Sequence, residues 1–314
     1  MVAFADVEAL LATQDATEVV QEAARSSFAL SGFTRDTMTK GRTRTPLVSI
    51  LPTAGWESGE LGSTTRRKNV SNWGVSPKYL VAVPMSTIVP LPEEVIDDSS
   101  YDVWGAIKPG ISTIFARMLD AAVLFGVNKP AQWTDAAVIP GAIAAGNVVY
   151  AGDATDIAAA INGAFELVEE DGYDVTGVAS KRSIRSALRG LRDANGAPIF
   201  VSELASAPGS VATVYGAPLY SVNNGAWDST VAQALVGNLS YVHIGVRQDM
   251  TFKVLDQATL ESGSTTIHLG QEDALALRVT FRVAYAIFDP VNPEAVDGYP
   301  FAVVAPGSAP ETNG

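Results

Sequence analysis

The residue types that most often carry chemistry are sparse in this chain. His243 and His268 are its only histidines, and there is no cysteine, so the chain offers no thiolate nucleophile or thiolate metal ligand. Each histidine lies in an alternating strand pattern and lacks an H-x-x-H or H-E-x-x-H partner. Both are therefore interpreted as structural residues and not as metal ligands.

Acidic pairs are the remaining candidates for acid–base chemistry. Asp97–Asp98, Glu169–Glu170 and Glu272–Asp273 are sequence neighbours at the ends of predicted elements, where solvated charge is the ordinary explanation. A glycosidase pair would combine distant segments, so the sequence leaves that reaction open without pointing to it. The motifs G-x-G-x-x-G, G-x-x-x-x-G-K-[ST] and G-x-S-x-G are absent. We expect a protein that is not an enzyme and has no cofactor or metal.

Composition indicates a globular, strongly acidic chain. Its 314 residues are enough for two domains, and 47% are hydrophobic against 18% charged. The net charge of −13 disfavours general nucleic-acid binding, because clustered Lys and Arg contact phosphates. The most apolar run, 136–152, is interrupted by proline and glycine, and no basic signal-peptide segment is visible. We expect neither a membrane span nor a secretory leader.

The longest periodic pattern is an alternation from Asp273 to Pro290. Apolar branched and aromatic side chains occupy every second position from Leu275 to Ile287, with alanine, threonine and arginine between them. A period of two predicts one extended strand with an apolar face. At ~3.3 Å per residue this strand would be on the order of 45 Å long, which predicts an elongated protein.

The first 46 residues are predicted to form an arm. A short helix is expected at 17–26, and the polar segment that follows carries four basic residues: Arg35, Lys40, Arg42 and Arg44. The segment has too few apolar residues for a core of its own, so it is expected to be disordered or to lie across another surface.

Residues 46–90 have the pattern of a β-hairpin, with strands at 47–52 and 79–89. A two-stranded ribbon is marginal alone in water, so we expect it to lie on a neighbouring copy; a long surface loop is the alternative. Its polar tip contains five charged residues: Glu57, Glu60, Arg66, Arg67 and Lys68. These residues and the basic residues of the arm are the predicted contacts between subunits, and repetition of such pairs predicts a salt-sensitive assembly.

A long helix is predicted from about Tyr101 to Phe125, because apolar residues recur with i, i+3, i+4, i+7 spacing. Gly126 is its expected C-cap, and Pro109 is expected to kink or split it. The apolar stripe is interpreted as core that packs on the long strand.

An α/β module is predicted at 153–250, with helices at 155–171 and 181–192 and several short strands. The second helix has a basic face, formed by Lys181, Arg185, Arg189 and Arg192. This face can hold an acidic neighbour or a phosphate, but a solvated helix face is the simpler interpretation.

Several motifs follow one another in a specific order: GWESGE, PLPEEVIDDS, MLDAAVLFG, LRGLRDANGAPIF, VYGAPLYSV, ALVGNLSYVHIGVRQDMTF and LALRVTFRVAYAIFDPVNPEAV. Together they resemble the major capsid proteins of tailed bacteriophages with the HK97 fold, over nearly the whole chain. The resemblance implies an α+β fold with an N-terminal arm at 1–46, an extended E-loop at 47–90, a peripheral domain from 91–152 with 251–314, and an axial domain at 153–250.

The resemblance also implies a function and partners. Identical subunits would form hexamers and pentamers that close into an icosahedral shell around double-stranded DNA, without reading its sequence. A separate scaffolding protein and a portal would be partners, and decoration proteins optional ones. The shell would assemble in the bacterial host cytoplasm and remain in the virion.

Two departures from the family pattern lead to predictions. The arm begins close to Met1, so a fused scaffold is not expected. In the name-giving phage, a hairpin Lys is crosslinked to an Asn with the help of a Glu. Lys68 or Lys78 could correspond to that Lys. Alignment of the last strand, however, places Asp273 at the position of that Asn and Thr280 at the position of that Glu. No covalent crosslink is therefore expected.

Two other protein classes stay open. An encapsulin-type bacterial nanocompartment shares this fold but packages enzymes. In encapsulins the N-terminal arm forms an inner groove where cargo docks, and the basic, flexible arm predicted here is poorly suited to that role. An unrelated hydrolase would require a folded monomer with a pocket of convergent carboxylates.

Overall fold

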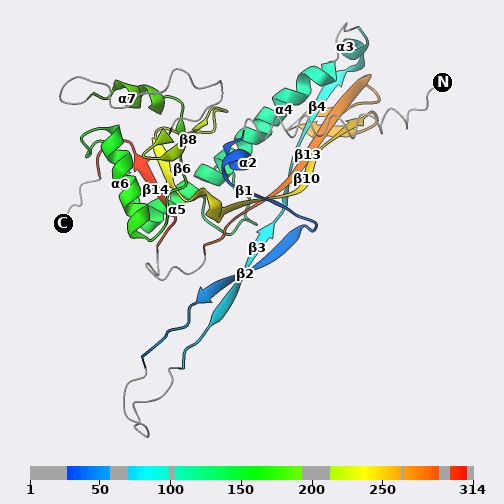
Figure 1. The fold of residues 1–314 in the computed structure, drawn as a ribbon. Coiled ribbons are helices and arrows are strands. Elements are labelled where there is room, and N and C mark those ends of the chain that lie inside the picture. Colours follow the sequence, from blue (N-terminus) through cyan, green and yellow to red (C-terminus); the bar gives the residue numbers. More distant parts are fainter. Residues whose placement is uncertain are drawn as a thin grey trace.

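The structure is a computed structural model that describes residues 27–56, 70–98, 103–192, 213–262, 265–289 and 298–309. The molecule is elongated, as the long strand predicts, with a long sheet at one end and a second sheet with its helices at the other (Figure 1). A narrow hairpin projects from the body between them.

The long sheet has the strand order β1-β10-β13-β4. The predicted long strand is confirmed as β13, Ala274–Ile287. It pairs antiparallel with β10, Val242–Leu255, on one side and with β4, Val83–Pro92, on the other. The short edge strand β1, Thr34–Thr37, runs parallel to β10.

The predicted long helix covers one face of this sheet. It consists of α4, Val103–Asp120, and a π-helical continuation η1, Ala121–Phe125, which ends at Gly126 in the left-handed conformation, as expected. Pro109 lies within α4 and does not split it; the hydroxyls of Ser112 and Thr113 donate to the Pro109 carbonyl. The apolar face of β13 and the inward stripe of α4 share one buried core.

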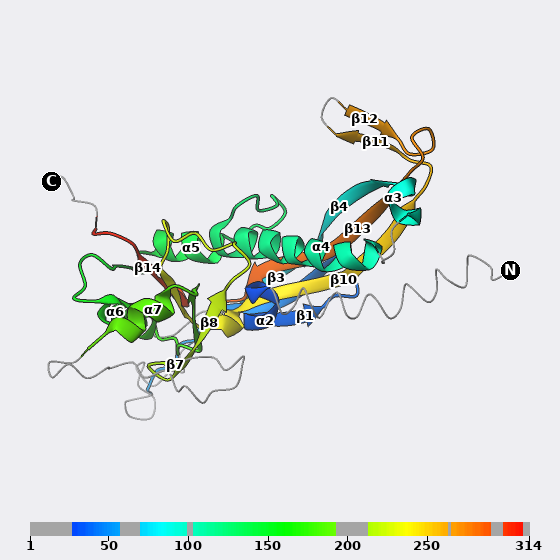
Figure 2. The same ribbon diagram turned by 90° about the horizontal axis from the view of Figure 1, so that it is seen from above.

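The second sheet has the order β5-β14-β9-β6-β8-β7. In that order its strands are Val148–Tyr150, Phe301–Ala305, Ala234–Gly237, Gly177–Lys181, Ala217–Val222 and Thr213–Val214. Helices α6, Ile157–Glu170, and α7, Ile184–Gly190, pack on one face, and α5, Val138–Ala145, packs on the other. In Figure 2, α5 lies end to end with α4 along the same side of the molecule.

The membership of the two sheets corrects the predicted module. Residues Val242–Val246, predicted to belong to it, begin β10 of the long sheet, because β10 continues through two register shifts instead of ending. Strands β5 and β14 come from outside 153–250 and complete the six-stranded sheet. The segment 131–152 contains α5, which the sequence reading missed because Pro140 argued against a helix; a proline in the first turn is tolerated.

The predicted hairpin is confirmed, with a different second strand. Strand β2, Arg42–Ile50, pairs with β3, Gly74–Val81, and the hairpin ends there. The predicted strand 79–89 divides at Ala82, after which β4 leaves the hairpin and pairs with β13. Alternation continues on both sides of Ala82, so periodicity alone did not reveal the change of partner.

The predicted arm is wrong for residues 27–38, which fold onto their own chain. Helix α2, Phe28–Gly32, is buried against α4 and β8, and β1 extends the long sheet. Phe28, Leu30 and Phe33 supply enough apolar surface for this packing. The predicted helix at 17–26 lies outside the described residues.

The remaining elements lie mainly at the far end of the long sheet. Helix α3, Glu93–Asp97, follows β4, and strands β11, Thr259–Ser262, and β12, Thr265–His268, form a small hairpin there (Figure 2). A single 3₁₀ turn, η2, Leu239–Tyr241, precedes β10.

Candidate functional site

The two histidines make separate local contacts. His243 Nδ1 lies 2.7 Å from an Asp36 carboxylate oxygen, and its ring packs on Phe288. His268 Nδ1 lies 3.0 Å from the Thr259 hydroxyl. In the part of the chain that the structure describes, no group of three or more His, Asp or Glu residues is arranged to hold a metal ion, and no helix is long and apolar enough to cross a bilayer.

The acidic pairs do not form a catalytic pocket. All six carboxylates, in Asp97–Asp98, Glu169–Glu170 and Glu272–Asp273, belong to exposed residues. The first and last pairs lie near each other, because the Glu93 amide donates to the Asp273 carbonyl at 2.8 Å. Neither pair is buried, so no water-excluded geometry favours general acid–base catalysis there.

The projecting hairpin is the most unusual surface of the molecule. Large apolar side chains are exposed along it, with Trp56 fully exposed and Trp73 at 67%. The others are Ile50, Leu51, Val70, Val75 and Tyr79. Exposed apolar surface of this kind, on a ribbon with little body of its own, is typical of an interaction site.

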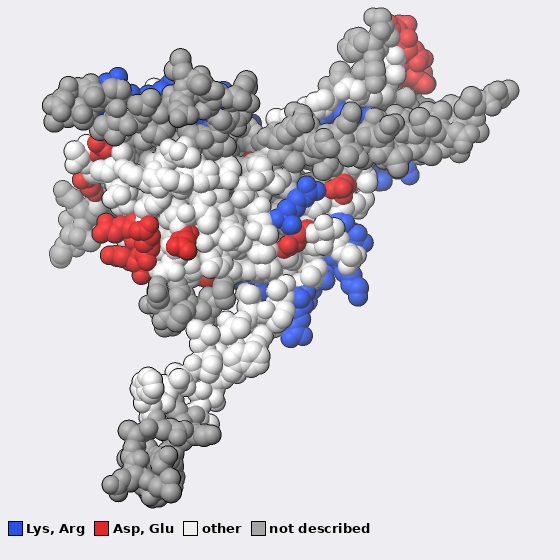
Figure 3. Space-filling model, viewed as in Figure 1, with Lys and Arg blue, Asp and Glu red and all other residues white. Residues whose placement is uncertain are grey.

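The basic residues of the predicted arm lie near the base of this hairpin. Arg42 and Arg44 are exposed on β2, where the Arg42 guanidinium stacks 3.8 Å from the Tyr79 ring centroid. Arg35 is 3.8 Å from Asp249, an exposed pair of small energetic weight, and Lys40 is exposed. Basic atoms gather where the hairpin leaves the body (Figure 3). The five charged residues predicted at the tip, from Glu57 to Lys68, lie outside the described residues.

The base of the hairpin is fixed to the body by two polar contacts. Lys78 Nζ lies 2.7 Å from Asp135, whose other oxygen accepts the Ile287 amide at 2.8 Å. The indole N–H of Trp133 donates to the Val81 carbonyl at 3.1 Å. The hairpin is therefore attached to the body at its base while its outer part stands away from it (Figure 1).

Among the residues that the structure describes, the face of the long sheet opposite α4 is covered only in part. Near the hairpin, Ala284 and Ala286 are buried under Met38 and Leu80. Further along, Lys253 lies directly opposite Arg278, and both are exposed. Neither has an acidic partner within ion-pair distance among the described residues. Like charges in register are unfavourable, so this part of the face favours an anionic contact.

Sequence reasoning missed a buried carboxylate, Asp120, at the end of α4. It accepts hydrogen bonds from the Ser27 hydroxyl at 2.7 Å, from the Phe28 and Ala29 amides at 2.9 and 2.8 Å, and from the Asn224 amide group at 2.6 Å. Burial raises the pKa of Asp120, and the four hydrogen bonds oppose that shift. A single Asp inside an apolar helical stripe was the only available signal.

The fold and the exposed hairpin define an HK97-like shell protein, and comparison with known proteins agrees. The model of the phage capsid family matches residues 8–296, so the chain belongs to the phage capsid family. It is a structural protein of the virion capsid and assembles with identical subunits. The encapsulin alternative is not favoured.

Solved structures show the same fold. One from Microbacterium phage Oxtober96 is 42% identical, with a TM-score of 0.81, and the match covers 90% of this chain and 91% of that one. One from Mycobacterium phage Cain is 31% identical, with a TM-score of 0.81 and coverages of 91% and 92%. The capsid of a native GTA particle computed with C5 symmetry, at 15% identity, TM-score 0.60 and coverages of 91% and 90%, shows the fold alone. No curated protein matches the chain.

Proposed function

We propose that this capsid protein forms hexamers and pentamers in an icosahedral shell around double-stranded DNA, and that each projecting hairpin lies on a neighbouring copy. The observation that carries the proposal is the exposed apolar surface of the hairpin, above all Trp56 and Trp73. A neighbouring copy buries these side chains at about 25 cal/mol per Å² of apolar area.

The uncovered part of the long sheet is the proposed receiving surface. Its cationic residues, Lys253 and Arg278, fit the carboxylates of Glu57 and Glu60 in the hairpin of the next copy. Each exposed pair contributes only about 0–1 kcal/mol, so apolar burial supplies most of the affinity and the charges set the register.

We propose that these contacts are non-covalent. Lys78, one of two candidate crosslinking lysines, is ion-paired with Asp135 of its own chain, and the aligned partner positions hold Asp273 and Thr280. Mature particles boiled in denaturant should therefore run as single chains on a gel. A ladder of linked subunits contradicts this.

The remaining roles follow from the same assembly. A net charge of −13 favours a shell that encloses DNA without sequence-specific contact. A separate scaffold and a portal direct closure in the host cytoplasm, and the protein catalyses no reaction. The division into arm, E-loop, peripheral and axial domains applies with the changes described above: residues 27–38, β4 and all of β10 belong with the long sheet, and β5 and β14 belong with the axial sheet.

The test uses the full chain, expressed with its phage scaffold where shells require it, and electron microscopy of the product. The double variant Trp56→Ser/Trp73→Ser removes the two most exposed aromatic anchors of the hairpin, and Val127→Ser, at an exposed apolar residue in a loop of the body, is the control. Shells should be lost in the double variant and kept in the control. Normal shells from the double variant would overturn the proposed role of the hairpin.

A further inference from the structure

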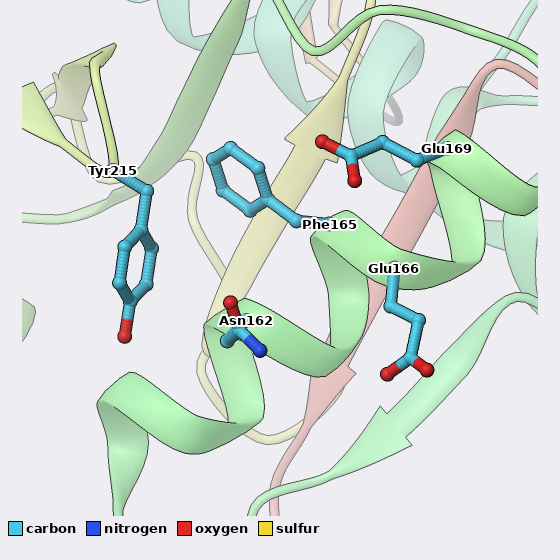
Figure 4. A pocket seen from close by; sticks show the side chains of 5 residues that line it. All are labelled: Asn162, Phe165, Glu166, Glu169 and Tyr215. Carbon is cyan, nitrogen blue, oxygen red and sulfur yellow. The ribbon is translucent and has the colours of Figure 1, made fainter.

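A shallow pocket lies between α6 and the turn that joins β7 to β8 (Figure 4). Its volume is about 410 Å³. It is lined by Asn162, Phe165, Glu166, Glu169 and Tyr215. The four residues of α6 follow i, i+3, i+4, i+7 spacing and so share one face of the helix, with Phe165 buried as the floor and the other three exposed.

Tyr215 forms the opposite wall of the pocket and occupies an unfavourable backbone position. Tyr215 and Gly216 connect paired Val214 and Ala217 as a two-residue hairpin turn, with φ of 49° and 84°. Such a type I′ turn prefers Asn-Gly, and a bulky residue at positive φ is an outlier. The ring makes an edge contact with Phe165, and its hydroxyl donates to the Ala158 carbonyl, yet 56% of Tyr215 stays exposed.

The chemistry of this pocket fits a guanidinium group. Glu166 and Glu169 have no ion-pair partner among the described residues. A planar guanidinium can pair with a carboxylate through two parallel hydrogen bonds and can stack on an aromatic ring at the same time. Lysine is a poorer fit because its ammonium is compact and strongly hydrated.

Arginines that suit this pocket are present in the same chain: Arg185 and Arg189 on α7, and Arg192 just after its end. Arg189 Nε donates to the Arg185 carbonyl at 3.2 Å, and Arg192 Nη1 donates to the Arg189 carbonyl at 2.7 Å. None of the three arginines has a carboxylate partner among the described residues. Helices α6 and α7 are neighbours in one subunit, yet their charges do not meet; acidic atoms over α6 and basic atoms over α7 lie on separate sides of this lobe (Figure 3).

We propose that the pocket formed by α6 and Tyr215 receives Arg189 of the next copy within a capsomer, so that α7 of each subunit docks on α6 of its neighbour. Two different, complementary surfaces on one subunit give a head-to-tail contact, which builds a ring when the rotation between successive copies closes. This inference rests on the proposed assembly into hexamers and pentamers and names one contact within them.

Charge reversal tests the pairing. Glu169→Arg and Arg189→Glu should each raise the protein concentration needed for assembly roughly tenfold or more, because one partner of a close charge pair is left facing a like charge. The combination of both reversals should restore assembly. Glu170→Arg, one residue along on α6 and outside the pocket lining, is the matched control and should assemble normally. Normal assembly of both single reversals, or no restoration in the combination, would overturn the pairing.

Tyr215→Asn separates a role in assembly from a role in folding. Asn-Gly is the preferred sequence for this turn, so the isolated chain should fold as before in a thermal melt. Assembly should be weakened, because the aromatic wall that stacks on the guanidinium is lost. A variant that melts normally and assembles as well as the native chain would refute the role of Tyr215.

Chemical crosslinking tests proximity directly, because the chain has no native cysteine. A disulfide needs closer Cβ atoms than an ion pair provides, so a short bismaleimide is the suitable reagent. Glu169→Cys combined with Arg189→Cys should give a ladder up to the size of a capsomer, while each single substitution should not. If only monomers appear in native shells, the contact is wrong while the shell itself stands. If the native chain forms no shells at all, the broader proposal has failed.

Discussion

Replacement of Asp120 by Ala should destabilise the subunit far more than the loss of an ordinary helix cap. Asp120 is fully buried and accepts four hydrogen bonds, three of them from the N-cap and the first turn of α2. The variant leaves the Ser27 hydroxyl, the Phe28 and Ala29 amides and the Asn224 amide group without their acceptor. It also leaves a small cavity beside the end of α4.

The loss in free energy of unfolding depends on how many hydrogen-bond donors lose Asp120 as their acceptor. Each buried polar group left unsatisfied costs about 1–3 kcal/mol, but Ser27 can reorient and the costs are not additive. Removal of one partner from a buried charged network typically costs about 3–5 kcal/mol, and we expect a value in that range. A domain is stable by only about 5–15 kcal/mol, so the loss is a large fraction of the total.

The assay is urea unfolding of the unassembled chain, with Asp156→Ala as a matched control. Asp156 caps α6 through the Ala159 amide at 2.9 Å, but it is only partly buried, so its loss should cost about 1 kcal/mol. Equal costs for the two variants would refute the reasoning, since they would show that burial of the Asp120 network adds nothing beyond capping.

Three further results are expected. Burial raises the pKa of Asp120, so Asp120 contributes most to the free energy of unfolding below its unfolded pKa of about 3.9. The difference in unfolding free energy between the native chain and Asp120→Asn should therefore shrink as the pH rises. A difference that grows with pH would contradict a raised pKa. Gly237→Ala would overlap the Pro300 carbonyl and the Phe301 ring and should cost about 1–3 kcal/mol in urea unfolding, whereas Gly110→Ala, in open space on α4, should stabilise by about 1 kcal/mol. Reversal of Arg66 and Arg67 to Glu should impair assembly in light scattering, most clearly at low salt; unaltered shells would exclude a role for these charges.

The sequence was informative where periodicity and partner coincide. The alternation of β13 and most of the apolar stripe of α4 were predicted correctly, because the two elements bury one face against each other. Ile114 and Met118 also fit the helical spacing of that stripe, but both are exposed. The sequence was less informative where the two-residue alternation of a strand continues although the strand changes its pairing partner. Strand β4 continues the alternation of β3 beyond Ala82, and β10 runs through the predicted end of the module, so the pattern gives strand type without its partner.

The arm shows a different reason for failure. Its average composition is polar, but Phe28, Leu30 and Phe33 lie within six residues and pack into the core. Their docking also depends on Asp120, which is more than ninety positions further along the chain. A contact of this range has no local pattern, so sequence reasoning underestimated how much of the segment belongs to the body.

This correction changes the physical argument for a shell. Residues 27–38 need no neighbouring copy for their stability, since Asp120 holds α2 and β1 completes the long sheet. The hairpin therefore leaves from a fixed base, reinforced by the Lys78–Asp135 pair. A ribbon fixed at its base loses less conformational entropy on binding than a free arm, so more of its apolar burial remains as affinity. Order within the subunit, more than a lack of internal contacts, is what prepares this chain to assemble.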